Sequence, residues 1–201
     1  MVRSNFNNKI FVYLASQSPR RMELLNQLGI TCEMLPTCID ETQLKNETPE
    51  QYVKRLAKEK AQTCVFRLTD VQKNYPILAA DTTVTIEGKV LGKPDNDLDA
   101  IKMLNSLSGR QHQVHTAVAL AFNNKIEVVL STTSVEMMEL TQKQIMFYVE
   151  TGEPHDKAGS YGIQGLAGAW IKRIDGSYSG VMGLPLYETS ALLRKYGIGT
   201  F

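Results

Sequence analysis

The sequence predicts an α/β protein built on a mixed β-sheet. Two short, continuously apolar runs, at residues 10–15 and 76–80, have the pattern of strands that are buried on both faces. Two further pairs of strand-like segments are each joined by a two-residue turn, as in β-hairpins. Helix-start signals lie between these strands along the chain. Strands mixed with helices favour an α/β fold, and the hairpins make part of the sheet antiparallel.

Helix-start signals order the first third of the chain. Residues 18–19, Ser-Pro, are suited to the N-cap and first turn of a helix, which Gly29 would close. A strand-like segment follows around residues 32–35. The capping box at residues 48–51, Thr-Pro-Glu-Gln, predicts a second helix that runs to about Arg67.

The remaining elements continue the alternation of strands, turns and helices. In order, we expect a strand that ends at Asp81, a short hairpin over residues 83–92, a helix over 97–107, a long hairpin over 111–136, a helix over 141–150, a glycine-rich loop over 152–166, a strand over 169–174 and a helix over 185–196. Asp81 would then lie at the carboxyl end of a buried strand, where open α/β sheets bind their ligands.

Size and charge limit the kinds of function. The 201 residues suffice for one domain, or two small lobes that share a sheet, without disulfides or a structural metal. Lys and Arg number 22 and Asp and Glu 21, so no global basic field attracts nucleic acid or an anionic membrane. The three cysteines form no CxxC pair, and the apolar run at 10–15 is too short for a signal peptide or a membrane span. We therefore expect a cytoplasmic protein.

Lys60 breaks the amphipathic pattern of the helix predicted from residue 49. It falls in the middle of the apolar half, four residues after Leu56 and four before Cys64. A buried, unpaired ammonium would cost several kcal/mol. Either Lys60 emerges into a cleft or meets an anion, or it extends along apolar neighbours to the rim.

Residues 16–21, Ser-Gln-Ser-Pro-Arg-Arg, connect a buried strand to a helix start. Free backbone N–H groups, hydroxyls and two guanidiniums converge there, which suits a phosphate ester. Arg21 shares a helix face with Leu24 and Leu28, so it is difficult to place in solvent. The alternative is an ordinary capped helix with two surface arginines. The chain has neither a GxxxxGK[ST] nor a GxGxxG motif, so a Walker A loop and a dinucleotide site are disfavoured.

The hairpin register predicts a lysine next to the strand-end aspartate. A two-residue turn pairs Ile86 with Lys89 and, continued along the ladder, sets Lys93 opposite Thr82 and beside Asp81. The two charges could form a plain ion pair. They could also form a site in which the carboxylate holds a cation or orients water while the lysine neutralises phosphate.

Other polar groups give weaker indications. Asp40 and Glu41 suit a solvated loop, or a second carboxylate for a divalent ion. His112 and His115 are three apart in a predicted strand, so they face opposite sides and cannot share one metal. No nucleophile–His–carboxylate pattern supports covalent acyl chemistry.

Seven different motifs follow one another along the chain. They are LASQSPRR at 14–21, YVKRLAKEKA at 52–61, AADT at 79–82, GKP at 92–94, LSG at 107–109, DKAGSYGIQG at 156–165 and GLPL at 183–186. With these motifs the sequence resembles the Maf family of nucleoside triphosphate pyrophosphatases, from about residue 13 to 196. The resemblance implies a twisted mixed sheet with helices on both sides and two lobes that flank a nucleotide cleft. It also implies one domain over residues 10–201, with residues 1–9 as an N-terminal extension.

The resemblance further implies hydrolysis of a nucleoside triphosphate between its α and β phosphates, with Mg²⁺ or Mn²⁺ as cofactor. By motif, Asp81 corresponds to the catalytic carboxylate, as general base or metal ligand, and Glu41 to its acidic partner and second metal ligand. The triphosphate-binding set would be Ser16, Arg20, Arg21, Lys60 and Lys93, with the two lysines also counted as catalytic.

Three positions resemble the family branch that acts on dTTP and UTP: Arg20, Thr82 and Gln164, which would bind substrate and set specificity. The branch that prefers 7-methyl-GTP would carry Gln in place of Thr82 and Glu in place of Gln164. An amide both donates and accepts hydrogen bonds, which suits uracil or thymine. The expected partner is a small triphosphate, with no nucleic acid or membrane, and the protein would be a homodimer. A house-cleaning hydrolase is expected; the alternative is a nucleotide-sensing regulator of cell division or septum formation with little turnover.

Overall fold

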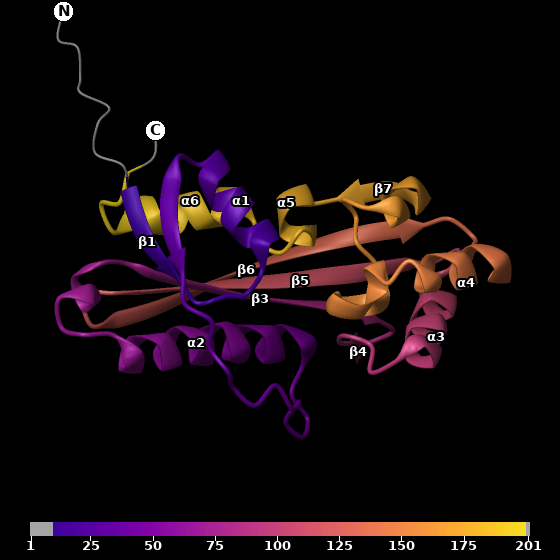
Figure 1. Ribbon diagram of the computed structural model, residues 1–201, viewed down its shortest axis with the longest axis horizontal. Coiled ribbons are helices and arrows are strands. Elements are labelled where there is room, and N and C mark those ends of the chain that lie inside the picture. The colour runs from indigo at the N-terminus through magenta and orange to yellow at the C-terminus, as the bar shows by residue number, and fades with distance from the viewer. Residues whose placement is uncertain (1–9, 200–201) are drawn as a thin grey trace, which may run out of the picture.

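A mixed β-sheet forms the centre of the protein in a computed structural model that describes residues 10–199 (Figure 1). Its seven strands are β1 (Ile10–Leu14), β2 (Ile30–Met34), β3 (Ile77–Ile86), β4 (Lys89–Leu91), β5 (Gln111–Phe122), β6 (Lys125–Met137) and β7 (Ile171–Asp175). The strand order is β2-β1-β3-β5-β6-β7, and β4 pairs with β3. β1 is parallel to β2 and β3, whereas the other pairs are antiparallel. The predicted mixed α/β sheet is confirmed.

Helices cover both faces of the sheet, as predicted. They are α1 (Pro19–Gln27), α2 (Pro49–Arg67), α3 (Asp97–Leu107), α4 (Gln142–Glu150), α5 (Tyr178–Val181) and α6 (Leu186–Lys195). α2 lies on one face and α1 and α6 on the other, while α3 and α4 pack together at the far end of the long strands (Figure 1). Among residues 10–199, no helix combines the length and the apolar character that a membrane span requires.

Three apolar clusters divide the molecule into two halves. In one half, α2 packs on alanines of the sheet such as Ala79 and Ala119, and α1 and α6 pack on the opposite face through Leu24 and Leu193. In the other half, the ends of β3, β5 and β6 pack with α3 and α4 around Leu104. The two halves share the long strands, which agrees with the predicted pair of lobes.

Several local predictions match the structure closely. α2 begins after the Thr48 capping box, in which Gln51 N–H donates to Thr48 Oγ1 and Thr48 N–H donates to Gln51 Oε1. The turn after β3 gives the predicted ladder, with Ile86 opposite Lys89. However, this ladder ends at Leu91, so Lys93 has no strand partner.

The predicted strand end at Asp81 is wrong. β3 continues through this residue, because residues 82–86 are all β-branched and favour extended backbone, and Asp81 pairs with Ala117 of β5. The strand that ends nearby is β1, whose Leu14 pairs with Leu78. Asp81 therefore lies inside one strand but beyond the end of the neighbouring strand.

The C-terminal third also differs from the prediction. Residues 153–170 contain three short 3₁₀ turns: η2 (Glu153–Asp156), η3 (Ala158–Ser160) and η4 (Leu166–Trp170). One further 3₁₀ turn, η1 (Gln72–Asn74), lies earlier in the chain, before β3. Because η4 extends through Trp170, β7 starts two residues later than predicted. Helix α5 was not predicted. The proposed extension at 1–9 lies outside the described residues.

On the side of β3 that faces away from β5, a stretch of the strand between β1 and β4 has no partner. β1 pairs with β3 only as far as Leu78, and β4 begins to pair at Val84. Residues 79–83 consequently have a neighbouring strand on the β5 side only. This gap in the sheet marks the boundary between the two halves and positions the cavity described below.

Candidate functional site

The gap in the sheet opens into a cavity of about 830 Å³. Every site residue predicted from the sequence lines this cavity: Ser16, Arg20, Arg21, Glu41, Lys60, Asp81, Thr82, Lys93 and Gln164. These side chains come from the β1–α1 connection, the loop before α2, α2 itself, β3, the segment after β4 and the loop after η3. The fold therefore gathers residues that are far apart in sequence around one hollow.

Lys60 joins the two carboxylates of the site. Its Nζ lies 2.6 Å from Asp81 Oδ1 and 2.7 Å from Glu41 Oε1. The side chains of Lys60 and Asp81 are only 13% and 10% exposed. Lys60 therefore lies on the apolar face of α2 because it meets two carboxylates there. The alternative, in which its side chain extends along apolar neighbours to the rim, is excluded. Asp81 is paired with Lys60, so the first of the two alternatives for Lys93, a plain ion pair with Asp81, does not form.

Burial and charge shift the two carboxylates in opposite directions. Burial raises the pKa of Asp81, against the opposing charges of Lys60 and Arg21. Burial also acts to raise the pKa of Glu41, but the hydrogen bond and charge of Lys60, with the charges of Lys93 and Arg21, outweigh it and lower that pKa. The site therefore combines one carboxylate that retains its proton more readily with another that loses its proton more readily.

Among residues 10–199, Arg21 is held by neutral acceptors only. Its Nε donates to the Gly183 carbonyl at 2.8 Å, and its Nη1 and Nη2 donate to Ser16 Oγ and Thr82 Oγ1, each at 3.2 Å. Burial lowers the pKa of Arg21, and the charge of Asp81 opposes this shift. Because no carboxylate contacts this guanidinium directly, its charge remains available to attract an anion.

The serines before α1 differ from the simple capping prediction. Ser18 occupies the N-cap position, but its side chain makes no capping hydrogen bond. Ser16 Oγ instead accepts from Ser18 N–H at 3.1 Å, in addition to Arg21. The N-terminus of α1 thus lacks a side-chain acceptor and is directed toward the basic side of the cavity, an arrangement that favours phosphate.

The other two basic residues are more exposed. Arg20 Nη1 contacts Asp156 Oδ2 at 3.3 Å, across the cavity, and Asp156 is shared with Lys157. Lys93 is exposed and makes no hydrogen bond or ion pair with any residue between 10 and 199. Lys93 therefore has no direct contact within residues 10–199 that would compete with a bound anion.

The hydroxyl of Thr82 faces the protein. It accepts from Arg21 and shares a hydrogen bond of 2.9 Å with Thr116 Oγ1, which donates to the Gly180 carbonyl. Thr82 thus acts on the site by orienting Arg21. This role was not apparent from the sequence, because Thr116 and Gly180 are remote in the chain.

Gln164 lies at the apex of a tight turn. Gly165 N–H donates to the Gly162 carbonyl at 3.1 Å, and the Gln164 side chain is exposed at the cavity wall. Glu153 supports this turn, since a Cβ on Gly165 would overlap its carboxylate. Glu153 Oε1 accepts from Tyr148 OH at 2.8 Å and Oε2 from Leu166 N–H at 3.2 Å. Glu153 was missed by the sequence analysis; its position just before the glycine-rich motif was the only available signal.

The two carboxylates fit a hard divalent cation that shares substrate oxygens. Mg²⁺ typically takes one or two protein carboxylates and completes its shell with water and phosphate oxygens. Asp81 and Glu41 supply such a pair, already held on one side of the cavity by Lys60. No group of three or more His, Cys, Asp and Glu side chains suited to a metal ion occurs within residues 10–199.

A cavity lined by basic side chains and a carboxylate pair, set at a gap in a mixed sheet, fits the class of enzymes that hydrolyse nucleoside triphosphates. The chain belongs to the Maf family: the model of the Maf-like protein family matches residues 11–196.

Several relatives share most of their length with this chain. A dTTP/UTP pyrophosphatase of Methylobacillus flagellatus is 56% identical over 191 residues, which is 95% of each chain. Proteins of the same name from Bordetella parapertussis and Nitrosomonas europaea are 52% and 48% identical, over 93% and 94% of this chain and 93% and 96% of theirs. Among solved structures, the Staphylococcus aureus Ham1 protein matches with a TM-score of 0.43 and 15% identity, over 63% of this chain and 71% of that chain.

Proposed function

We propose that the protein hydrolyses dTTP and UTP to the nucleoside monophosphate and pyrophosphate. Relatives about half identical over nearly the whole chain are named dTTP/UTP pyrophosphatases. The observation that supports this activity best is the contact of Lys60 with both Asp81 and Glu41, in the same cavity as Arg21, which no carboxylate of residues 10–199 contacts directly.

The triphosphate would bind along the basic side of the cavity. Its roughly four negative charges need local compensation, because the protein as a whole is almost neutral. In the part of the chain that the structure describes, no carboxylate contacts Arg21 or Lys93, and Arg20 is held only by an exposed aspartate. Lys60 differs, since its charge is already shared by two carboxylates. We therefore assign Lys60 chiefly to the carboxylate pair, and the phosphates to the other three cations.

Asp81 is the group closest in character to a catalytic base. Its burial raises its pKa, which makes the carboxylate a better proton acceptor from an attacking water. The alternative role, as the ligand that holds the cation, uses the same oxygen atoms. A divalent cation such as Mg²⁺ or Mn²⁺, held by Asp81 and Glu41, would polarise the α-phosphoryl group and neutralise charge. Pyrophosphate would leave with its charge held by Arg20, Arg21 and Lys93.

Gln164 would recognise the pyrimidine. Its exposed amide can donate to one and accept from another group on the uracil or thymine edge. The fixed turn beneath it would hold this amide in place. Such an enzyme suits a house-cleaning role on a cytoplasmic nucleotide pool, and a homodimer remains an expectation from the family.

Product analysis tests the proposal. A panel of triphosphates is incubated with Mg²⁺ or Mn²⁺, and pyrophosphate and orthophosphate are measured separately. Pyrophosphate release that is fastest with dTTP and UTP supports the proposal. Orthophosphate as the first product would exclude cleavage between the α and β phosphates. Tight nucleotide binding without metal-dependent turnover would favour the sensing role instead.

A further inference from the structure

The loop that carries Glu41 has no secondary structure of its own. It spans residues 35–48, between β2 and α2, and contributes Glu41 to the cavity. A catalytic carboxylate needs a fixed position, because small displacements of a reacting group lower the rate steeply. Gln43 Nε2 donates to the Glu47 carbonyl and Leu44 N–H donates to Glu47 Oε2, so the loop is held partly from within. Contacts from outside the loop fix it to the rest of the protein.

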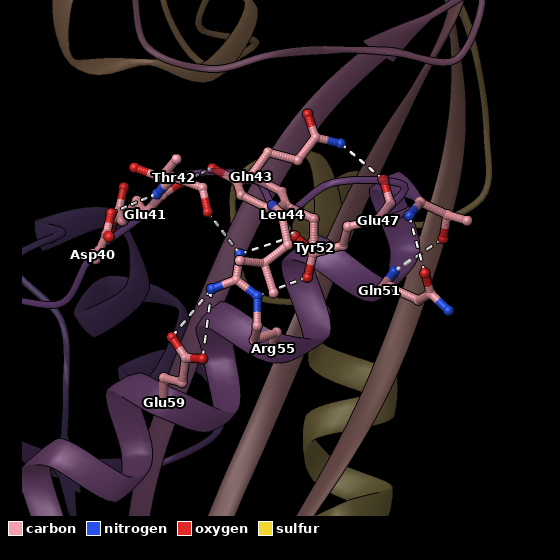
Figure 2. A network of polar contacts seen from close by, with 11 residues as sticks. Asp40, Glu41, Thr42, Gln43, Leu44, Glu47, Gln51, Tyr52, Arg55 and Glu59 are labelled. Atoms are coloured by element: carbon pink, nitrogen blue, oxygen red, sulfur yellow. Dashed lines mark hydrogen bonds and ion pairs between the residues drawn. The ribbon is translucent and has the colours of Figure 1, made fainter.

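Arg55, on α2, binds the loop at two points (Figure 2). Its Nε and Nη2 contact Glu47 Oε1 and Oε2 at 2.7 and 2.9 Å, a two-pronged ion pair. Nη2 also donates to the Thr42 carbonyl at 3.0 Å, next to Glu41. The remaining arm, Nη1, faces Glu59 one turn along the helix at 3.3 Å.

The Arg55–Glu47 ion pair is partly withdrawn from water, unlike ordinary surface pairs. The Arg55 and Glu47 side chains are 19% and 7% exposed. The hydrogen bond and charge of Glu47 raise the pKa of Arg55. Two-pronged arginine–carboxylate pairs fix geometry as well as adding energy.

Three residues of α2 thus hold Glu41 in place. Tyr52 OH donates to the Glu41 carbonyl at 2.9 Å, and Arg55 holds the next carbonyl, that of Thr42. Lys60, two turns beyond Tyr52, holds the Glu41 carboxylate at 2.7 Å. The backbone on one side and the carboxylate on the other are set by the same rigid helix.

We propose that Arg55 is a positioning residue, which clamps the 35–48 loop to α2 and thereby sets Glu41 against Lys60 in the cavity. The kinetic test of this inference rests on the proposed function, because it measures UTP hydrolysis. It concerns a residue that lines no part of the cavity and acts only through Glu41. A lysine could not replace it, because only the planar guanidinium fork can serve Glu47, Thr42 and Glu59 together.

The kinetic test is a double-mutant cycle between Arg55→Gln and Glu41→Gln. UTP turnover is measured at steady state with substrate in excess, and a higher enzyme concentration is used for slow variants. Arg55→Gln should lower kcat by ~10-fold or more, with KM within ~3-fold of wild type, because the loss is in positioning. The double variant should have the kcat of Glu41→Gln alone. Effects that multiply, or a wild-type kcat in Arg55→Gln, would overturn the proposal.

Amide hydrogen exchange provides a readout that does not need turnover. Arg55→Gln should accelerate exchange over residues 36–47, relative to wild type and to Lys58→Gln. Lys58 is the matched control, because it lies on the same helix, is exposed and has no hydrogen-bond or ion-pair partner within residues 10–199. Lys58→Gln should leave both kcat and exchange unchanged, and equal exchange in the two variants would overturn the proposal.

The two hypotheses fail separately. A wild-type protein that releases no pyrophosphate would disprove the proposed function, and the exchange comparison would still decide whether Arg55 is the clamp. If Arg55→Gln does not fold, Glu47→Gln removes the charge of the same ion pair from the loop side. It should accelerate exchange over residues 36–47 and lower kcat, and wild-type values of both would count against the clamp.

Discussion

Lys60 donates a hydrogen bond of 2.6 Å from the apolar face of α2 to Asp81 on β3. The contact crosses from a helix to a strand at the point where the sheet lacks a neighbouring strand. The same ammonium reaches Glu41, so one cation keeps two carboxylates close together. The two carboxylates are therefore already close together before a cation or a phosphate group would bind.

Asp81→Asn should lower kcat for UTP and dTTP by at least ~10²-fold, the usual scale for loss of a positioned acid–base group. The amide keeps the shape of the side chain, and Lys60 retains Glu41 as a partner. Pyrophosphate release and thermal unfolding should be measured together. A well-folded Asp81→Asn variant with wild-type turnover would remove Asp81 from the mechanism.

The activity should fall as the pH drops through the raised pKa of Asp81. The catalytic form is the carboxylate, and burial makes this group hold its proton to a higher pH than an ordinary aspartate. The acid limb of kcat/KM against pH should therefore lie above the usual aspartate range. The same profile for Glu41→Gln separates the two groups, because the pKa of Glu41 is lowered. An acid limb that disappears in Glu41→Gln would contradict the assignment to Asp81.

Lys60→Met should destabilise the fold more strongly at high pH than at low pH. Without the ammonium, two neighbouring carboxylates remain, and burial with mutual repulsion raises the pKa of Asp81 further. A folded-state pKa above the unfolded value means that stability is lost as pH rises through that range. Removing one member of a buried pair costs on the order of 3 kcal/mol. Denaturant unfolding at pH 5 and pH 8 checks this, and an equal loss at both values would contradict it.

Arg21→Lys should lower kcat/KM for UTP by ~10-fold or more, although it keeps the positive charge. A lysine cannot serve Gly183, Ser16 and Thr82 at once. Thr82→Val removes one of those acceptors but preserves the shape of the side chain. It should therefore also lower kcat/KM for UTP, by a smaller factor than Arg21→Lys. Steady-state kinetics of both variants measure the effect. A larger loss in Thr82→Val would assign Thr82 a direct contact with substrate.

Gln164→Glu should lower kcat/KM for UTP by ~10-fold or more, because a carboxylate can no longer donate to a uracil oxygen. Hydrolysis of GTP or 7-methyl-GTP should fall less or rise. The ratio of kcat/KM between UTP and these purines measures the change. A ratio that matches wild type would show that Gln164 does not contact the base.

Helical periodicity made Lys60 predictable, whereas Thr82 and Gln164 came only from the resemblance to the Maf family. The position of Lys60 on the apolar face of α2 follows from spacing alone, and so does its need for an anion. Which anions Lys60 meets could not be predicted, because its contacts with Asp81 and Glu41 depend on how α2, β3 and the 35–48 loop pack together. Local patterns contain no information about that distance.

The strand end at Asp81 was wrong for a related reason. The apolar run stops there, yet β5 pairs with β3 through Asp81 and onward, so the ladder overrides the change in polarity. Glu153 and Arg55 were missed because each acts on loop backbone that lies close only in the folded chain. Their sequence neighbours give no reason to separate them from solvated surface charges.

Hydrolysis of UTP in ¹⁸O-labelled water tests the central claim most directly. If the cavity directs water to the α-phosphorus, the label appears in UMP and the pyrophosphate is unlabelled. Label in the pyrophosphate, or release of orthophosphate and UDP, would place the attack on another phosphorus and contradict the account.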